Sequence, residues 1–201
     1  MSFTIHRYPV HLIDVVYLAN GRRVLMRPAL PQDGELLRAF VQGLSSEARY
    51  FRFLTKFSEL PQGIVDRFTR IDYQRHVALI AETVTRAGET MVGEARYVID
   101  EQDPEIAEFA LAVADDWRGM GLAGTLLERL VDHAASSGIR RIVGDAFATN
   151  TAIVTFAKRY GFTVTRSLGD SRLVRVVKDL VTQDQHAISV EQSLQEAAVA
   201  A

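Results

Sequence analysis

Cysteine is absent from the 201-residue sequence. Its absence excludes disulfide bonds, thiol catalysis and thiolate metal ligands, and it is compatible with a reducing compartment, so we expect a cytoplasmic protein. Long apolar runs are also lacking, since none approaches the roughly 18 residues that cross a bilayer. The opening stretch MSFTIHRYPV has no signal-peptide core. We therefore expect no membrane partner and no export.

A strong charge of either sign is missing too. The net charge of -2 and the pI near 6.2 provide no electrostatic footprint for nucleic acid. Basic and aromatic residues alternate between Arg49 and Phe57, and such a pattern can stack on bases. The acidic total favours packed helix faces with solvated arginines instead, so we expect no nucleic-acid partner. The five histidines show no metal-ligand spacing, so we also expect no metal.

Hydrophobic residues make up 48% of the chain, which is enough for a single core, and we expect one domain over residues 1–180. The expected strands cover residues 15–18, 24–27, 76–84, 91–99, 106–113, 140–145, 162–168 and 173–178. The expected helices cover residues 33–44, 46–53, 61–68, 121–136 and 150–159. This order predicts an α+β fold with a mostly antiparallel sheet that is parallel only where a helix crosses over. Residues 181–201 are expected to form a C-terminal tail.

A glycine-rich segment follows the expected strand at 106–113 and opens a helix. Gly119, Gly121 and Gly124 spell G-x-G-x-x-G. Free backbone N–H groups at a helix start, with glycines that let a ligand approach closely, form a site for phosphate or pyrophosphate. The sequence therefore predicts an anion site at this turn.

Two common phosphate motifs compete for this segment. A dinucleotide fingerprint requires its first glycine directly after the strand, whereas residues 114–118 intervene here. This interpretation is weakened but stays open as the alternative of a dinucleotide-binding protein. A Walker A loop requires Lys-Ser/Thr where the chain has Thr125-Leu126, so no lysine reaches the phosphate.

A third interpretation takes the whole stretch. The run Arg118-Gly119-Met120-Gly121-Leu122-Ala123, with Asn150 and Gly161-Phe162 further on, resembles the Arg/Gln-x-x-Gly-x-Gly/Ala pattern of the GCN5-related N-acetyltransferases (GNAT). The segments SSEARYFRFL and AEFALAVADDWRGMGLAGTLLERL look like the acetyltransferase domain of bacterial Pat-type protein lysine acetyltransferases. The resemblance implies the GNAT fold, with about seven strands and parallel strands splayed at the acyl-CoA site.

The resemblance also implies acetyl-CoA as the co-substrate. Its pyrophosphate would be held by N–H groups from Met120 to Thr125, and its pantetheine arm would pair with the strand at Leu111 to Val113. The implied binding residues are Leu111, Ala112, Val113, Arg118, Gly119, Met120, Gly121, Leu122, Ala123, Gly124, Thr125 and Asn150. Asn before an apolar run is also an ordinary helix N-cap, so for Asn150 both roles stay open.

Glu108 is the candidate general base. Strand alternation places it on one face with Ala110 and Ala112, and a carboxylate there is costly to bury without a partner or a purpose. A protonated amine must lose a proton before it attacks a thioester, and Pat-like enzymes carry their catalytic glutamate at this position. The structural alternative is an ion pair with Arg96 on the neighbouring strand.

The remaining candidates carry weaker signals. The family often places a tyrosine, the general acid, where this chain has Ala157, and Tyr160 three residues later is the substitute candidate. His76 precedes a strand that is expected to border the acceptor cleft, so it is a candidate for substrate binding or a second base.

The sequence thus predicts an N-acetyltransferase that transfers acetyl from acetyl-CoA to a primary amine, with a protein lysine favoured. A small-amine acetyltransferase and a non-catalytic acyl-CoA sensor are the alternatives, the latter because Ala157 replaces tyrosine. The resemblance also implies a possible homodimer through the final strands.

Overall fold

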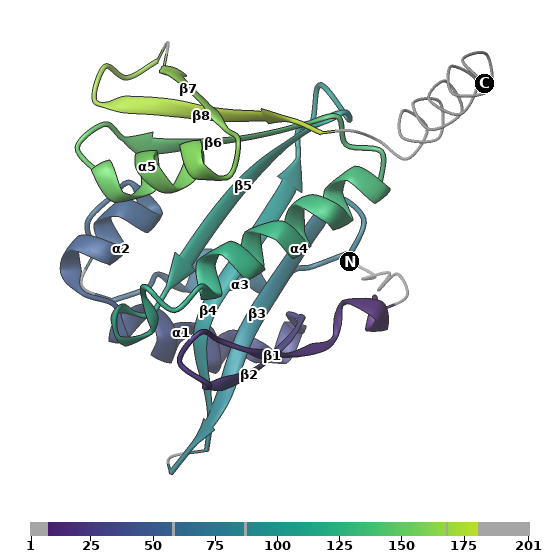
Figure 1. Ribbon diagram of the computed structural model, residues 1–201, viewed down its shortest axis with the longest axis vertical. Helices are drawn as coiled ribbons and strands as arrows, with labels where there is room; N and C mark the ends of the chain where they lie inside the picture. The colour runs from purple at the N-terminus through teal and green to yellow at the C-terminus, as the bar shows by residue number, and fades with distance from the viewer. Residues whose placement is uncertain (1–7, 58, 87, 168, 181–201) are drawn as a thin grey trace, which may run out of the picture.

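The structure is a computed structural model that describes residues 8–57, 59–86, 88–167 and 169–180. These residues form an eight-stranded sheet in the order β1-β2-β3-β4-β5-β6-β8-β7 (Figure 1). The strands are β1 (Asp14–Tyr17), β2 (Arg23–Pro28), β3 (His76–Thr85), β4 (Gly88–Ile99), β5 (Ile106–Val113), β6 (Arg141–Phe147), β7 (Thr163–Arg166) and β8 (Leu173–Asp179). The helices are α1 (Gly34–Gly43), α2 (Ser46–Phe53), α3 (Gln62–Thr69), α4 (Leu122–Ser136) and α5 (Thr151–Arg159).

The predicted α+β fold is confirmed, with eight described strands where about seven were expected. The predicted strands and helices are all present, and most ends shift by one or two residues. The order of the last strands was not predicted, since β8 lies between β6 and β7 and pairs antiparallel with both. The expected tail at 181–201 lies outside the described residues.

The sheet is antiparallel except between β5 and β6, which α4 connects. These two strands pair only from Ile106–Arg141 to Glu108–Val143, although β5 continues to Val113 and β6 to Phe147. Beyond Glu108 the two strands diverge, so that β5 and β6 form the sides of a wedge whose vertex lies at Glu108. Figure 1 shows α2 and α5 at the open end of this wedge. The β6-facing edge of β5 therefore carries backbone groups without a sheet partner.

The two faces of the sheet are covered by separate apolar clusters. Along β3, Val77 and Leu79 pack with the residues of α4, whereas Ala78 and Ile80 pack with those of α1. A strand that is buried on both faces reads as a continuous apolar run, as β3 does. Covered faces on both sides make the sheet a rigid frame for the wedge.

A buried ion triad attaches α2 to the sheet. Arg52 of α2 donates to Glu94 of β4 at 2.5 Å, and Arg96 donates from Nε to the other carboxylate oxygen at 3.1 Å. Burial opposes ionisation of Glu94, but the guanidinium groups of Arg96 and Arg52 outweigh it and hold the pKa of Glu94 at about 2. The expectation of solvated arginines in this segment is therefore wrong for Arg52, whose side chain is 8% exposed.

Replacing the central carboxylate by an amide will destabilise the fold. Glu94→Gln leaves two buried guanidinium groups without a counter-charge, and we expect a loss of about 3–5 kcal/mol of unfolding free energy in urea denaturation. Glu105→Gln, which breaks an exposed ion pair with Arg140, is the control and will cost less than about 1 kcal/mol. Equal effects of the two variants would contradict the role assigned to the triad.

The same triad predicts a pH dependence. The pKa of Glu94 is about 2 in the folded protein and 4.5 in a model peptide, so its contribution is complete above pH 4.5 and is lost as pH falls toward 2. Urea denaturation between pH 6 and 3 will show a loss of stability in the wild type that is smaller in the Glu94→Gln variant. An equal loss of unfolding free energy between pH 6 and 3 in the wild type and in the Glu94→Gln variant would refute this assignment.

Candidate functional site

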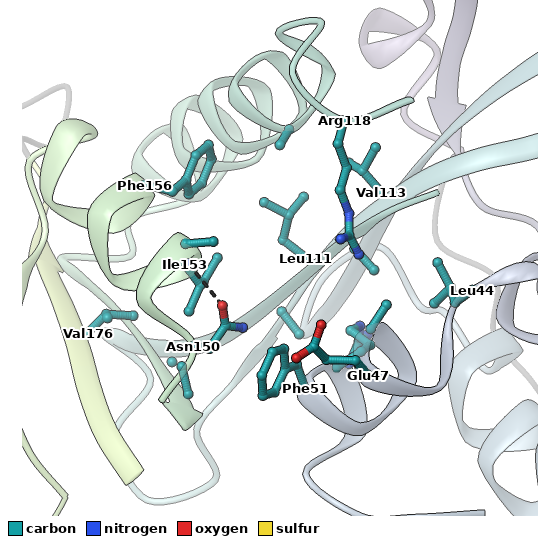
Figure 2. A pocket seen from close by; sticks show the side chains of 18 of the residues that line it. Leu44, Glu47, Phe51, Leu111, Val113, Arg118, Asn150, Ile153, Phe156 and Val176 are labelled. Carbon is teal, nitrogen blue, oxygen red and sulfur yellow. Dashed lines mark hydrogen bonds between the residues drawn. The ribbon is translucent and has the colours of Figure 1, made fainter. Parts of the chain in front are cut away.

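A pocket of about 450 Å³ fills the open end of the wedge. Its walls come from α2, the C-terminal half of β5, the glycine turn, β6 and α5, and Figure 2 shows their side chains around the space. The aromatic ring of Tyr50 stacks on Phe147 with centroids 4.5 Å apart, so α2 bridges from β5 to the end of β6. The pocket is therefore enclosed by segments that lie far apart in the sequence.

The β5 wall consists of residues 109–113, which include Leu111 to Val113, the stretch expected to pair with the pantetheine arm. The predicted alternation is confirmed: Phe109, Leu111 and Val113 join the α4-side cluster, and Ala112 packs against the other cluster. A methyl group on Gly144 of β6 would lie 3.0 Å from the Phe109 ring, so the two strands are close where they begin to separate. The free edge of β5 can accept an extended ligand by backbone hydrogen bonding.

The glycine turn presents a row of backbone donors. Gly119 and Gly121 have φ values of 71° and 91°, a left-handed conformation that L side chains rarely adopt. Among the described residues, the N–H groups of residues 119–124 have no backbone acceptor, whereas the Thr125 N–H donates to the Gly121 carbonyl at 3.1 Å. The free row thus ends at Gly124. This arrangement suits a pyrophosphate, because the positive end of the α4 dipole adds to the donors.

Not every side chain of this turn faces the pocket. Arg118 lines it and pairs with Asp115 at 2.9 Å, and Gly119 and Ala123 also line it. The side chain of Leu122 belongs to the core, and the Met120 carbonyl accepts a hydrogen bond from Ala19 in the N-terminal hairpin. These residues are placed to contribute backbone N–H groups to the site.

Asn150 lies on the opposite wall and is the N-cap of α5. Its side-chain oxygen accepts from the Ile153 N–H at 3.2 Å, the dashed contact in Figure 2. Because the oxygen is used for capping, the amide nitrogen is the group that Asn150 offers to a ligand in the pocket.

Glu108 is exposed on β5 at the last position that pairs with β6. It lies just before the pocket wall, one residue from Phe109, and the described residues offer it no ion pair. Arg96, the partner considered from the sequence, binds Glu94 instead. The carboxylate therefore stands at the vertex of the wedge with its oxygens accessible.

His76 lies away from the pocket, and both of its ring nitrogens are engaged. Arg96 donates to Nε2 at 3.1 Å, so Nδ1 carries the proton and faces the Arg70 carbonyl at 3.2 Å. Burial and the charge of Arg96 lower the pKa of His76 to about 4. The neutral ring connects β3 to α3 and leaves no nitrogen free for an acceptor.

Tyr160 ends α5 and also lies outside the pocket wall. Its ring packs on Phe156 with a centroid distance of 4.6 Å, and its hydroxyl lies directly against Gly124 in the first turn of α4. A larger side chain at this position would overlap the tyrosine unless the ring moves.

The pocket contains charged residues that were not predicted as site residues, namely Glu47, Arg52 and Asp145. Glu47 and Phe51 are four residues apart on α2 and both line the pocket. This i, i+4 spacing is a signal from which the pocket face of α2 could have been found. In the described part of the chain, no group of three metal-ligating side chains occurs, and no helix is long and apolar enough to cross a membrane.

Comparison with known proteins gives consistent results. Residues 44–162 match the model of the acetyltransferase (GNAT) family. The chain is 35% identical over 158 residues to the acetyltransferase PA5475 of Pseudomonas aeruginosa, covering 78% of this chain and 84% of that protein.

Solved structures show the same similarity. The GNAT domain of S. lividans Pat aligns with a TM-score of 0.79 and 31% identity, over 87% of this chain and all of that domain. The fold is also similar to yncA, a putative acetyltransferase from Salmonella typhimurium solved with its cofactor acetyl-CoA, with a TM-score of 0.59 and 19% identity over 78% of this chain and 94% of that one.

The contact between Gly124 and Tyr160 can be tested by substitution. A Cβ at residue 124 would lie 2.7 Å from Tyr160 Cζ, so Gly124→Ala will destabilise the protein by about 1–3 kcal/mol in chemical denaturation. Gly63→Ala in α3, where the new methyl group meets nothing within 4 Å, is the control and will leave stability unchanged or slightly raised. Combining Gly124→Ala with Tyr160→Ala will cost less than the sum of the two, and strict additivity would refute the contact.

Proposed function

The chain belongs to the GNAT family of acetyltransferases, and from this premise we propose that it acetylates a primary amine, specifically the side chain of a protein lysine, with Glu108 as general base. Membership of this family replaces the dinucleotide-binding alternative. The observation that carries the proposal is the wedge itself, in which a free strand edge runs from a row of N–H groups, unpaired within the described part of the chain, to an accessible carboxylate.

Acetyl-CoA is the acyl donor of the family, and the pocket residues fit it. In this proposal the N–H groups of residues 119–124 bind the pyrophosphate, and the edge of β5 at Leu111 to Val113 pairs with the pantetheine arm. The Asn150 amide adds a donor from the opposite wall. The thioester then lies toward the vertex, where β5 and β6 meet at Glu108 and Val143.

The proposed chemistry is direct transfer. An amine with a pKa near 10 arrives protonated, and Glu108 accepts its proton directly or through water. The nitrogen attacks the thioester carbon, the C–N bond forms and the C–S bond breaks. A CoA thiolate with a pKa near that of cysteine, roughly 8.5, leaves without strong acid assistance. Tyr160 is the candidate acid, although its hydroxyl lies beside Gly124 rather than in the pocket.

Two features support a protein lysine over a free small amine. The GNAT domain of S. lividans Pat aligns over its whole length, and the sequence resembles the Pat-type protein lysine acetyltransferases. Glu108 is exposed, so a long side chain presented by a protein surface can reach it.

A cytoplasmic location and a homodimer are also part of this proposal.

Removing the proposed base will separate binding from turnover. Glu108→Gln keeps the size of the side chain but cannot accept the proton, so we expect kcat to fall by about 100-fold or more while the Kd of acetyl-CoA in calorimetry stays unchanged. Glu89→Gln, another exposed strand glutamate, is the control and will retain wild-type turnover. Unchanged turnover of the Glu108 variant would refute the assignment.

The wider proposal is tested by free-thiol release from acetyl-CoA against a panel of proteins, peptides and small amines. Turnover on lysine-containing proteins or peptides, blocked by prior lysine methylation, is the expected result. Turnover only on small amines would refute the lysine acceptor. Tight acetyl-CoA binding with no turnover on any acceptor would indicate the acyl-CoA sensor instead.

A further inference from the structure

The proposed acetyl transfer does not use the carboxylate of Glu47. It is the second residue of α2 and lines the pocket, and Figure 2 shows its carboxylate turned into the pocket space. Glu47 is exposed, so an acceptor can reach its carboxylate from solvent.

The other charged residues of the pocket wall already have partners. Arg52 binds Glu94, and Arg118 binds Asp115 at 2.9 Å. Asp145 receives two hydrogen bonds from Arg175, at 3.0 and 2.7 Å. Within the described ranges, the Glu47 side chain forms no ion pair and no hydrogen bond. Among the charged side chains that line the pocket, Glu47 is therefore the one without an ion-pair partner in the described ranges.

The position of Glu47 separates it from Glu108. Ser45 at the start of α2 donates from N and Oγ to Asp115, just after β5, at 2.8 and 3.1 Å. The far end of α2 is attached through Arg52 to Glu94, which lies opposite Ala112 in the sheet register. Ala112 is four residues from Glu108, about 13 Å at roughly 3.3 Å per residue. Glu47 lies near the start of α2, the end attached to Asp115, so it stands beyond Ala112, roughly 13 Å or more along the wedge from Glu108. Two carboxylates at this separation contact different groups of one acceptor.

We propose that Glu47 is a specificity-determining residue that binds a second cation on the acceptor. The acceptor is then a protein lysine with an arginine or lysine four to six residues away, since an extended peptide spans about 13–20 Å over that length. This inference rests on the proposed function and extends it from an amine to a basic sequence context. A monoamine has no group to occupy the Glu47 position.

The structural alternative is that Glu47 only stabilises α2. Acidic residues in the first turn favour a helix start, and Ser45 caps this one by accepting from the Ala48 N–H at 3.2 Å. A role confined to helix stability would lower activity on every acceptor alike. The charge preference among acceptors therefore distinguishes the two roles.

The test uses peptides with a single lysine and with Arg, Ala or Glu four to six residues away, and it measures kcat/KM by thiol release. We expect the wild type to prefer Arg over Ala by about five- to tenfold, the range of a partly sheltered ion pair. Glu47→Gln will abolish this preference with an unchanged Kd for acetyl-CoA, and Glu47→Lys will favour the Glu peptide. Glu35→Gln, the exposed first-turn glutamate of α1, is the matched control and will keep the preference.

The possible failures are distinguishable. A wild-type enzyme that acetylates all peptides equally, or a Glu47→Gln variant that keeps the preference for Arg, overturns the inference and leaves the proposed function intact. A uniform loss of activity on all peptides in the variant indicates the helix-stabilising role and also overturns it. A wild type that acetylates no lysine peptide or protein refutes the proposed acceptor, and the inference with it.

Discussion

The separation of two parallel strands is the constraint on which the site depends. β5 and β6 pair for three register positions and then diverge, and this leaves the edge of β5 without a sheet partner from Phe109 onward. An unpaired edge in a sheet interior is normally a liability, because its N–H and C=O groups require hydrogen-bond partners. Here the edge borders a pocket, so an extended ligand can supply them. The same crossover brings the start of α4, with its unpaired N–H groups, to the mouth of the wedge.

The position of α2 decides the shape of the remaining wall. The helix is fixed at its start by Asp115, at its far end by Glu94, and across the wedge by stacking of Tyr50 on Phe147. A fully buried carboxylate between two guanidinium groups is costly to desolvate, and replacing all three charged residues by well-packed apolar ones would often be neutral for stability. Its directional hydrogen bonds, however, specify one orientation of α2, which an apolar contact would not.

Family membership and side-chain geometry answer different questions about this protein. The family establishes an acetyltransferase that uses acetyl-CoA, and the features proposed to bind it, a strand edge and a glycine turn, offer mostly backbone groups. In our proposal the acceptor is instead recognised by side chains of α2 and β5. A carboxylate at each end, one near the vertex and one near the mouth, is the feature by which this chain selects its amine in our proposal.

Local patterns in the sequence determined most of the elements and the anion site, because strand alternation, helical periodicity, the Asn150 cap and the left-handed glycines depend on neighbours within a few residues. Contacts between distant segments were decided only by the tertiary structure. Glu94 lies within an expected strand, and its pairing with Arg52, 42 positions away, has no local sequence signal. The hydroxyl of Tyr160 against Gly124, the insertion of β8 beside β6, and the turning of Glu47 into the pocket likewise arise from packing of whole elements. The sequence thus predicted the glycine turn that we propose as the pyrophosphate site, whereas the charges that line the pocket follow from how α2 is held across the wedge.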